Sequence, residues 1–346
     1  MNPEWKAHLE QKGAVFDADT VRDFGDPQGE TRATTGQVVL ADLSHLGLIA
    51  AAGEDAMEFL QGQLSNDVRQ VDTEHSQLAA YCSPKGRILA DLRLFRREET
   101  YYLILPRAIL EPTLKRLRMF VLRSRVTLND ASETLVGFGV AGPQADAALS
   151  SALGAVPGTV DEVSHGQGLS VIRLPGSSPR FHVFGSPEAA IALWERLGPQ
   201  SRPVGAGAWG LLDILAGLPS IDPATVDTFV PQMVNLQAIG GVSFKKGCYP
   251  GQEVVARTHY LGKLKRRMYR AHVETDRAPQ PGEEIYATDS PEQSAGRIVS
   301  AQRSPEGGYE LLAVIQIASA EKNALHLGDA EGPGLVLREL PYALEA

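Results

Sequence analysis

The chain has 346 residues, a formal net charge of −9 at pH 7 and an ordinary globular composition, with 43% hydrophobic and 22% charged residues. This length predicts about two or three domains with enough apolar residues for buried cores. The negative charge excludes a surface that binds polyanions as a whole, so contact with nucleic acid or an anionic ligand would need a local basic patch.

The first part of the chain predicts a mixture of helices and strands. Residues 1–36 are polar and uneven, which indicates one or two helices and a loose connection. Residues 37–53 carry β-branched side chains with short alternation, typical of a strand. Residues 53–68 then predict a helix, although Gly62 weakens it. Its apolar face would hold Met57, Phe59, Leu60 and Leu64.

The next block combines strands with a helix. The sequence LAAYCSPKGRILADLRLF, residues 78–95, predicts two strands joined by the turn SPKG. Residues 101–106 predict a third strand, and a helix follows to about Leu122, in which Pro112 is tolerable only in the first turn. The stretch RVTLND closes the block. Strands followed by a helix and another strand suit an α+β layer.

Two later segments repeat one order of elements. Residues 135–153 and 180–198 each predict a strand, a short break and a helix. In the second segment Ser186 is the expected N-cap, Pro187 the first helical residue and Gly198 the end of the helix. This echo indicates a second α+β unit rather than a solenoid, because two copies are too few.

The C-terminal part changes in character. Residues 208–222 predict a helix that stops at Gly217 and Pro219. From about residue 262, short strands such as RMYRAHV, EEIYA, AGRIVSAQ and LLAVIQI alternate with turns rich in Pro and Gly. That pattern is typical of a small antiparallel barrel or sandwich. We therefore place a domain boundary near Gly262.

Cysteine usage and hydropathy bear on the cellular compartment. Two cysteines, Cys82 and Cys248, are too few for a disulfide framework. The N-terminal sequence MNPEWKAHLEQKGAV has no apolar run typical of a signal peptide. No stretch approaches the roughly eighteen apolar residues that cross a bilayer. We expect a reduced, cytoplasmic protein without a membrane partner, and no cysteine or histidine cluster at zinc spacing predicts a metal site.

A local cationic stripe stands out in residues 245–270. It contains Glu253 as its only carboxylate, and it attracts phosphates or carboxylates from several ångströms away. The alternative is a pair of solvated strands whose charges face water. The cations of the stripe are Lys245, Lys246, Arg257, Lys263, Lys265, Arg266, Arg267 and Arg270.

Cys248 lies inside this stripe. Neighbouring lysines favour the thiolate, which attacks electrophiles or binds metals, and Gly247 and Gly251 permit a tight backbone that a ligand can approach. An inert structural thiol is the alternative, because free cysteine is often buried. Cys82, in an apolar strand, is predicted to be structural. Asp91 either binds a polar ligand or lies on a solvated strand face.

With these segments described, the sequence resembles the YgfZ family of folate-binding proteins, which are relatives of the aminomethyltransferase, or T-protein, of the glycine cleavage system. The resemblance is carried by PQMVNLQAIGGVSFKKGCYPGQEVVAR, residues 231–257, which matches the family signature around K-G-C-Y-x-G-Q-E. Supporting stretches are FLQGQLSNDV, AAYCSPKGRILADLRLF, AWGLLDILAGLPSID and the terminal LPYALEA. The similarity runs from about residue 37 to the end.

The resemblance implies an α+β fold, a three-domain ring with tetrahydrofolate at its centre. Residues 37–261 would form two α+β folate-binding subdomains from interleaved segments. Residues 262–346 would form a C-terminal antiparallel β-barrel, and residues 1–36 an N-terminal extension outside the resemblance.

The resemblance also implies roles for individual residues. Trp209 would stack on folate, and a second aromatic of the family falls near Leu46, which is not aromatic here. Arginine and lysine of the stripe would hold the glutamate tail of the folate, which can be polyglutamylated. Cys248 would be the functional thiol, facing folate, a cluster or a partner. The cofactor-binding positions of the signature are Lys245, Lys246, Gly247, Tyr249, Gly251, Gln252, Glu253 and Arg257.

Three functions follow as hypotheses. The first is a tetrahydrofolate-binding accessory protein for iron–sulfur cluster assembly or repair, with iron–sulfur enzymes or assembly proteins as partners and an indirect role in tRNA thiomethylation. The second is a folate-dependent one-carbon transferase using Asp91, although Ala90-Asp91 replaces the paired Asp of T-proteins. The third is direct RNA binding through residues 257–270, which the net charge and the few aromatics of the stripe disfavour. We therefore expect no direct tRNA contact.

Overall fold

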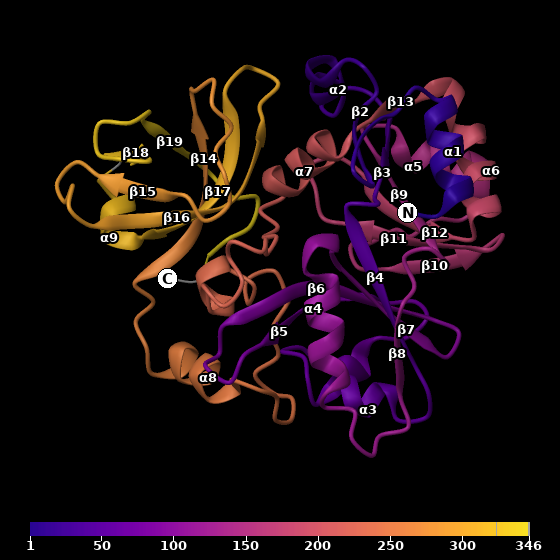
Figure 1. Cartoon of the computed structure of the whole chain (residues 1–346), viewed down its shortest axis with the longest axis horizontal. Helices are drawn as coiled ribbons and strands as arrows, with labels where there is room; N and C mark the ends of the chain where they lie inside the picture. Colours follow the sequence, from indigo (N-terminus) through magenta and orange to yellow (C-terminus); the bar gives the residue numbers. More distant parts are fainter. Residues whose placement is uncertain (323, 345–346) are drawn as a thin grey trace. The chain divides into compact units, whose positions relative to one another are not determined.

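The computed structural model describes residues 1–322 and 324–344. Residues 345 and 346, which end the predicted barrel and the stretch LPYALEA, lie outside the described residues. The chain divides into two compact units, each built from discontinuous segments (Figure 1). The first unit comprises Met1–Leu60, Val68–Gln77 and Leu92–Leu212, and the second comprises Gln61–Asp67, Leu78–Asp91 and the chain from Asp213 onwards.

A six-stranded sheet forms the centre of the first unit. Its strand order is β10-β11-β12-β9-β3-β13, in which only the pairing of β13 with β3 is parallel. Figure 1 shows helices α1, α5 and α6 gathered beside this sheet. The bounds are β3 Val39–Asp42, β9 Val136–Ala141, β10 Val163–Gly166, β11 Leu169–Leu174, β12 Arg180–Gly185, β13 Arg202–Val204, α1 Pro3–Gln11, α5 Ala145–Leu153 and α6 Pro187–Leu197.

Apolar side chains from these helices and strands build one core. Trp5 of α1, Phe138 of β9 and Trp194 of α6 are all buried there with their rings in contact. The repeated strand–helix order predicted for residues 135–153 and 180–198 is confirmed as β9–α5 and β12–α6. Residues 1–36 contribute to the same core through Trp5, and they also form β1 Val15–Asp17, β2 Thr20–Asp23 and α2 Pro27–Ala33.

The strand predicted over residues 37–53 is wrong as a single element. It consists of β3 and β4, which belong to different sheets. Asp42 ends β3 because its carboxylate accepts hydrogen bonds from the backbone N–H and hydroxyl of Ser44, which turns the chain. The indole N–H of Trp5 also donates to Asp42 at 2.7 Å, and burial raises the pKa of this carboxyl to about 6.

A five-stranded sheet has the order β5-β6-β7-β4-β8. The hairpin predicted over residues 78–95 is confirmed as β5 and β6. Most of β5 and the first residues of β6 belong to the second unit. A helix, α4, follows β7 as predicted. The bounds are β4 Leu46–Ala52, β5 Gln77–Cys82, β6 Ile88–Arg97, β7 Thr100–Pro106, β8 Thr127–Asp130 and α4 Arg107–Arg118.

Two helix predictions need correction. Pro112 lies in the second turn of α4, on its exposed side, where water can hydrogen-bond the carbonyl that the missing N–H leaves free. The helix predicted over 53–68 is only α3, Ala56–Gln61, which ends immediately before Gly62. Phe59 and Leu60 are buried, whereas Met57 is exposed and Leu64 lies beyond the helix.

The second unit contains a six-stranded antiparallel sheet with the order β18-β15-β16-β17-β14-β19, drawn in orange to yellow in Figure 1. The short strands predicted after residue 262 are confirmed, and residues 261–265 connect α8 to β14; the domain boundary itself stays a prediction. The bounds are α8 Gln252–Tyr260, β14 Arg266–Val273, β15 Glu284–Ala287, β16 Ser294–Arg303, β17 Tyr309–Gln316, α9 Ile317–Ala320, β18 Leu325–Leu327 and β19 Leu335–Arg338.

The remaining elements are one helix and three short turns of 3₁₀ helix. The helix α7 starts in the first unit and ends in the second. Within residues 1–322 and 324–344, no helix has the length and apolar character needed to cross a membrane. The bounds are η1 Val68–Gln70, η2 Gly198–Gln200, α7 Ala206–Leu215 and η3 Pro231–Val234.

Candidate functional site

The signature loop, residues 244–253, is held in place by a buried lysine. Lys246 is 6% exposed, and its ammonium group donates to the backbone carbonyls of Gln61 and Leu64, each at 2.5 Å. The same group lies 5.2 Å from the ring centroid of Tyr249. A buried charge is tolerated when its donors are satisfied, so Lys246 acts as a structural cation that joins distant parts of the chain. Its predicted role in folate binding stays a prediction.

The segment 61–67 is tied to the signature region by two further side chains. The hydroxyl of Ser65 donates to the carbonyl of Gly241 at 2.8 Å and accepts the N–H of Ala80. The amide of Asn66 donates to the carbonyls of Leu78 and Gly240, each at 2.7 Å. Residues 61–67 of FLQGQLSNDV and the end of PQMVNLQAIGG therefore form one hydrogen-bonded assembly within the second unit.

Gly251 brings the loop against the turn of the β5–β6 hairpin. Its φ angle is +81°, and a Cβ added there would lie 2.4 Å from the carbonyl oxygen of Ser83 and 2.6 Å from the backbone of Gly86. Only glycine satisfies both conditions without strain. Gly247 differs, because a Cβ at that position would meet no atom within 4 Å. The fold thus requires Gly251 and leaves Gly247 free to be replaced.

The two cysteines have opposite surroundings. Cys248 is exposed in the loop between Lys246 and Gly251, and Lys245 of the same loop is exposed as well. Cys82 is buried at the end of β5, and burial raises the pKa of its thiol to about 12. Cys82 therefore stays a neutral, inaccessible thiol at neutral pH, as expected of a structural residue. The thiol of Cys248 is the one that reagents and partners can reach.

Of the other predicted residues of the signature, Tyr249 belongs to the loop and the rest lie on α8. Tyr249 is buried, and burial, together with the neighbouring Cys82, raises the pKa of its phenol. Gln252 and Glu253 form the first turn of α8, and Arg257 lies exposed one turn later. Among the described residues, no carboxylate lies within ion-pair distance of Lys245 or Arg257, so both cations are available to an anionic ligand.

Asp91 lies on β6 within the second unit. Its carboxylate accepts the backbone N–H of Ile221 at 2.8 Å. Burial raises the pKa of Asp91 to about 6, and the nearby charge of Asp213 adds to the increase. The strand face is therefore enclosed rather than fully solvated, and the carboxyl group exchanges protons close to neutral pH. A group with that property can act as a general acid or base.

Trp209 belongs to the first unit and is a core residue. Its indole has no exposed surface. The guanidinium of Arg180 lies 4.9 Å from the ring centroid, and a Cβ on Gly139 would lie 2.4 Å from the ring edge. Glycine in β9 thus lets the indole approach the sheet backbone. Stacking on folate stays a prediction, and it would require these surrounding groups to move.

The ring next to Trp209 is His182, at a centroid distance of 5.7 Å. Burial, assisted by the charges of Arg93 and Arg180, lowers the pKa of His182 well below its usual range, so the imidazole is neutral. Among the described residues neither ring nitrogen of His182 has a hydrogen-bond partner, and the indole N–H of Trp209 has none either. His182 and Trp209 are thus both buried while their ring nitrogens remain without a hydrogen-bond partner among the described residues.

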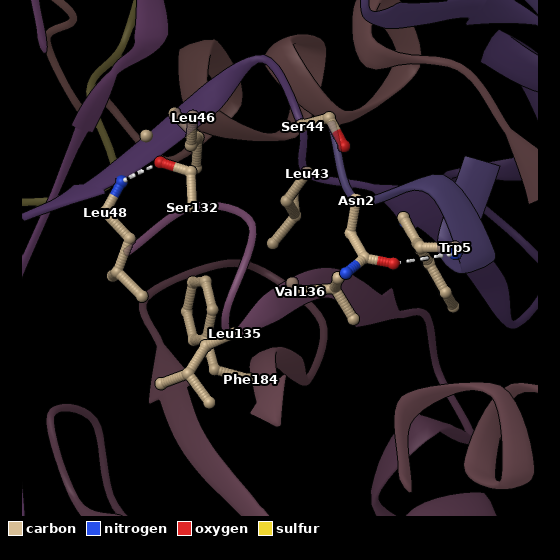
Figure 2. A pocket seen from close by; sticks show the side chains of 12 residues that line it. Asn2, Trp5, Leu43, Ser44, Leu46, Leu48, Ser132, Leu135, Val136 and Phe184 are labelled. Carbon is tan, nitrogen blue, oxygen red and sulfur yellow. Dashed lines mark hydrogen bonds between the residues drawn. The ribbon is translucent and has the colours of Figure 1, made fainter. Parts of the chain in front are cut away.

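Leu46 lines a small pocket in the first unit (Figure 2). The pocket lies between the start of β4 and the strand β9, and apolar side chains such as Leu48, Leu135 and Phe184 form most of its wall. Ser132 closes one side, where its hydroxyl accepts the backbone N–H of Leu48 at 2.9 Å. Leu46 therefore offers an aliphatic contact, and no aromatic ring, at the position where the family has an aromatic.

The predicted residues fall into two groups. Asp91 and the signature residues 245–257 belong to the second unit, whereas Leu46 and Trp209 belong to the first. Reasoning from the sequence missed Ser65 and Asn66, although it singled out the stretch that contains them. In residues 1–322 and 324–344, no three His, Cys, Asp or Glu side chains are arranged to hold a metal ion.

Comparison with known proteins bears on the family of the chain. Residues 12–167 match the model of the GCVT N-terminal domain. The curated relatives from Sodalis glossinidius and Photorhabdus laumondii, each called tRNA-modifying protein YgfZ, are 32% and 33% identical. The matches cover 89% and 90% of this chain and 94% of each relative.

A solved structure shows the same fold. The glycine cleavage system aminomethyltransferase T from Bartonella henselae superposes with a TM-score of 0.78 at 20% sequence identity. The match covers 99% of this chain and 97% of that chain. The predicted α+β fold of the T-protein type is therefore confirmed, with an antiparallel C-terminal sheet. The identity of 32% and 33% to the two curated relatives, over about nine-tenths of the chain, shows that the chain belongs to the YgfZ family.

Proposed function

We propose that this protein is a tetrahydrofolate-binding accessory protein for the assembly or repair of iron–sulfur enzymes, and that it thereby supports tRNA modification. The observation that carries the proposal is the exposed thiol of Cys248, presented by a loop that Lys246 and Gly251 hold in place. Relatives called tRNA-modifying proteins support the link to tRNA. Residence in the reducing cytoplasm would keep this thiol free.

The cationic residues of the signature fit part of a folate molecule. The glutamate tail of folate carries carboxylates, and exposed Lys245 and Arg257 are cations that can bind them. The ring system of folate is a different matter, since the indole of Trp209 is fully buried and Leu46 is aliphatic. The residues present therefore support recognition of the tail, and they offer no exposed aromatic face to the pterin at Trp209.

The role of Cys248 in this proposal is to contact an iron–sulfur cluster, a sulfur species or a partner protein. A thiolate is the form that performs any of these tasks. Because the side chain is exposed, a serine or alanine at this position should leave the fold intact. A matched control is available in Cys82, whose replacement removes the other thiol of the protein from a buried position.

The experiment uses cells that lack the gene and receive the wild-type protein, Cys248→Ala or Cys82→Ala. Mass spectrometry measures the thiomethylated nucleosides of tRNA, and calorimetry measures the affinity of each purified protein for tetrahydrofolate. We expect Cys248→Ala to lower tRNA thiomethylation while its folate affinity stays unchanged, and Cys82→Ala to retain both. Equal loss of both properties in Cys248→Ala would mean that the thiol is structural.

A second function is favoured by one observation, the carboxyl of Asp91 with a pKa of about 6. Such a group suits a one-carbon transferase that uses tetrahydrofolate. Ala90 replaces the first Asp of the T-protein pair, which disfavours aminomethyl transfer of that type. The test is the release of a one-carbon folate from a panel of aminomethyl and methyl donors. Turnover that disappears in Asp91→Asn would support this function, and absence of turnover would reject it.

A further inference from the structure

Three aromatic side chains meet at the end of α8. The ring of Phe244, from the signature loop, lies 3.8 Å from that of His259, with an angle of 10° between the planes. Tyr260 stands edge-on to both, at 4.7 Å from His259 and 6.0 Å from Phe244. Phe244 precedes the cationic stripe in sequence and lies 15 residues before His259. Its ring therefore adds to the aromatic surface that the stripe itself supplies.

This cluster lies at the surface. Tyr260 is 65% exposed and the following Leu261 is 85% exposed. His259 is also exposed, and Val255, one helical turn earlier, is the buried residue of α8. Since Val255 alone is buried in α8, Tyr260 and Leu261 present most of their apolar surface to solvent instead of packing into a core. Exposed apolar groups gathered in this way indicate a binding surface.

Cations follow the aromatic cluster directly. Lys263, Lys265 and Arg266 are exposed, and among the described residues no carboxylate lies within ion-pair distance of them. The sequence from Val254 to Val273 contains no acidic residue, although the whole chain carries a net charge of −9. The positive charge here is therefore local and uncompensated. We name these residues the α8 face: Phe244, His259, Tyr260, Leu261, Lys263, Lys265 and Arg266.

We propose that the α8 face binds single-stranded RNA, such as a loop of tRNA. The cations would contact the phosphates, and a base would stack on the exposed ring of Tyr260. An acidic protein surface would also be attracted to the cations, but it makes no use of stacked rings beside them. Proteins that bind single strands combine these two features. This inference rests on the proposed role in tRNA modification and adds a direct contact with the RNA.

The experiment measures fluorescence anisotropy with a labelled single-stranded RNA of about twelve nucleotides, the same RNA as a duplex, and a tRNA transcript, over a series of salt concentrations. We expect the single strand and the tRNA to bind more tightly than the duplex. Lys263→Glu with Lys265→Glu should weaken binding about tenfold or more and reduce the salt slope by about 1.4. Tyr260→Ala should weaken binding at least about fivefold without changing that slope, and Tyr260→Phe should retain it.

The matched control is Arg303→Glu with Arg338→Glu, two exposed arginines on the β-sheet of the same unit. It changes the net charge by the same amount as the lysine pair, so unchanged RNA binding in this control supports a specific face. Equal weakening in both pairs would overturn the proposal, as would equal affinity for duplex and single strand. Unfolding curves for each variant check that the fold is intact.

The outcome separates this inference from the function on which it rests. If no RNA binds but Lys263→Glu with Lys265→Glu still lowers tRNA modification in cells, the α8 face binds an acidic protein partner and the RNA proposal is rejected. If RNA binds through Tyr260 but Cys248→Ala leaves tRNA modification unchanged, the RNA contact stands and the proposed role of the thiol fails.

Discussion

The surroundings of Trp209, predicted to stack on folate, and of Cys248, predicted to be the functional thiol, contrast sharply. Trp209 is buried, with the guanidinium of Arg180 over its ring and the backbone of Gly139 at the ring edge. Cys248 is exposed to solvent, in a loop that the hydrogen bonds of Lys246 hold in place. The difference teaches that substitution of Trp209 should affect mainly stability, whereas substitution of Cys248 should affect mainly function.

The largest expected effect belongs to Trp209→Ala. Removing a fully buried indole should lower the free energy of unfolding by about 3–5 kcal/mol, because the surrounding core cannot close the cavity completely. Urea unfolding followed by circular dichroism measures this loss. Trp209→Phe is the control and should lose clearly less. A loss below about 1 kcal/mol for Trp209→Ala would mean that the indole is not a core residue and would break the comparison.

The glycines beside Cys248 should differ by a smaller amount. Gly251→Ala places a Cβ against the carbonyl of Ser83 in a left-handed backbone, so we expect a loss of about 2 kcal/mol or more. Gly247→Ala meets no neighbouring atom and should change stability by less than about 0.5 kcal/mol. Urea unfolding of both variants checks the pair. Equal losses would show that the loop is held in place by something other than contact with the hairpin turn.

Asp91 should make stability depend on pH. Its pKa in the folded protein is raised to about 6 from an ordinary value of 3.8, so its stabilising contribution is complete below pH 3.8 and is lost as the pH rises towards 6. Asp91→Asn removes this loss and can still accept the N–H of Ile221. The variant should therefore gain about 2 kcal/mol over the wild type at pH 7, compared with pH 4.

This change is measured as the difference between the two unfolding free energies at each pH. Asp42, whose pKa is also raised to about 6, titrates in both proteins and cancels in that difference. A difference that stays constant from pH 4 to pH 7 would show that Asp91 is solvated in the folded protein.

Cys248→Ser should have the smallest effect on stability, within about 0.5 kcal/mol, because the side chain is exposed. Its accessibility supplies a sharper measurement. Iodoacetamide should modify Cys248 in the folded protein and reach Cys82 only after unfolding, and mass spectrometry of peptides distinguishes the two sites. Modification of Cys82 at the same rate as Cys248 would contradict the burial of β5.

Local patterns explain which parts of the fold could be predicted from the sequence. The hairpin β5–β6, the repeated strand–helix order and the strands after residue 266 depend on alternation, turn residues and caps within a few positions. The division of residues 37–53 between two sheets could not be predicted in this way. It depends on Asp42, which the indole of Trp5 contacts from the first helix.

The site was predictable to a similar extent. The structural Cys82 follows from its apolar strand, whereas local chemistry left Cys248 open between a reactive thiol and an inert buried one. The roles of Lys246 and Phe244 depend on distant contacts. Lys246 is 182 residues away from Leu64, whose carbonyl it binds. Phe244 becomes part of an aromatic surface only when α8 folds back towards it. No spacing rule reports such contacts, and the buried state of Trp209 likewise depends on Gly139 in a separate strand.

The pairing of Lys246 with residues 61–64 has a consequence for synthesis of the chain on the ribosome. The segment Gln61–Asp67 belongs to the second unit, yet most of that unit is translated after residue 213. At ordinary rates of translation, Lys246 is synthesised on the order of 10 s after Gln61 and Leu64, whose carbonyls its ammonium group binds. Completion of the second unit during translation is therefore postponed until the signature loop leaves the exit tunnel, and truncated chains that stop before it should be targets for chaperones.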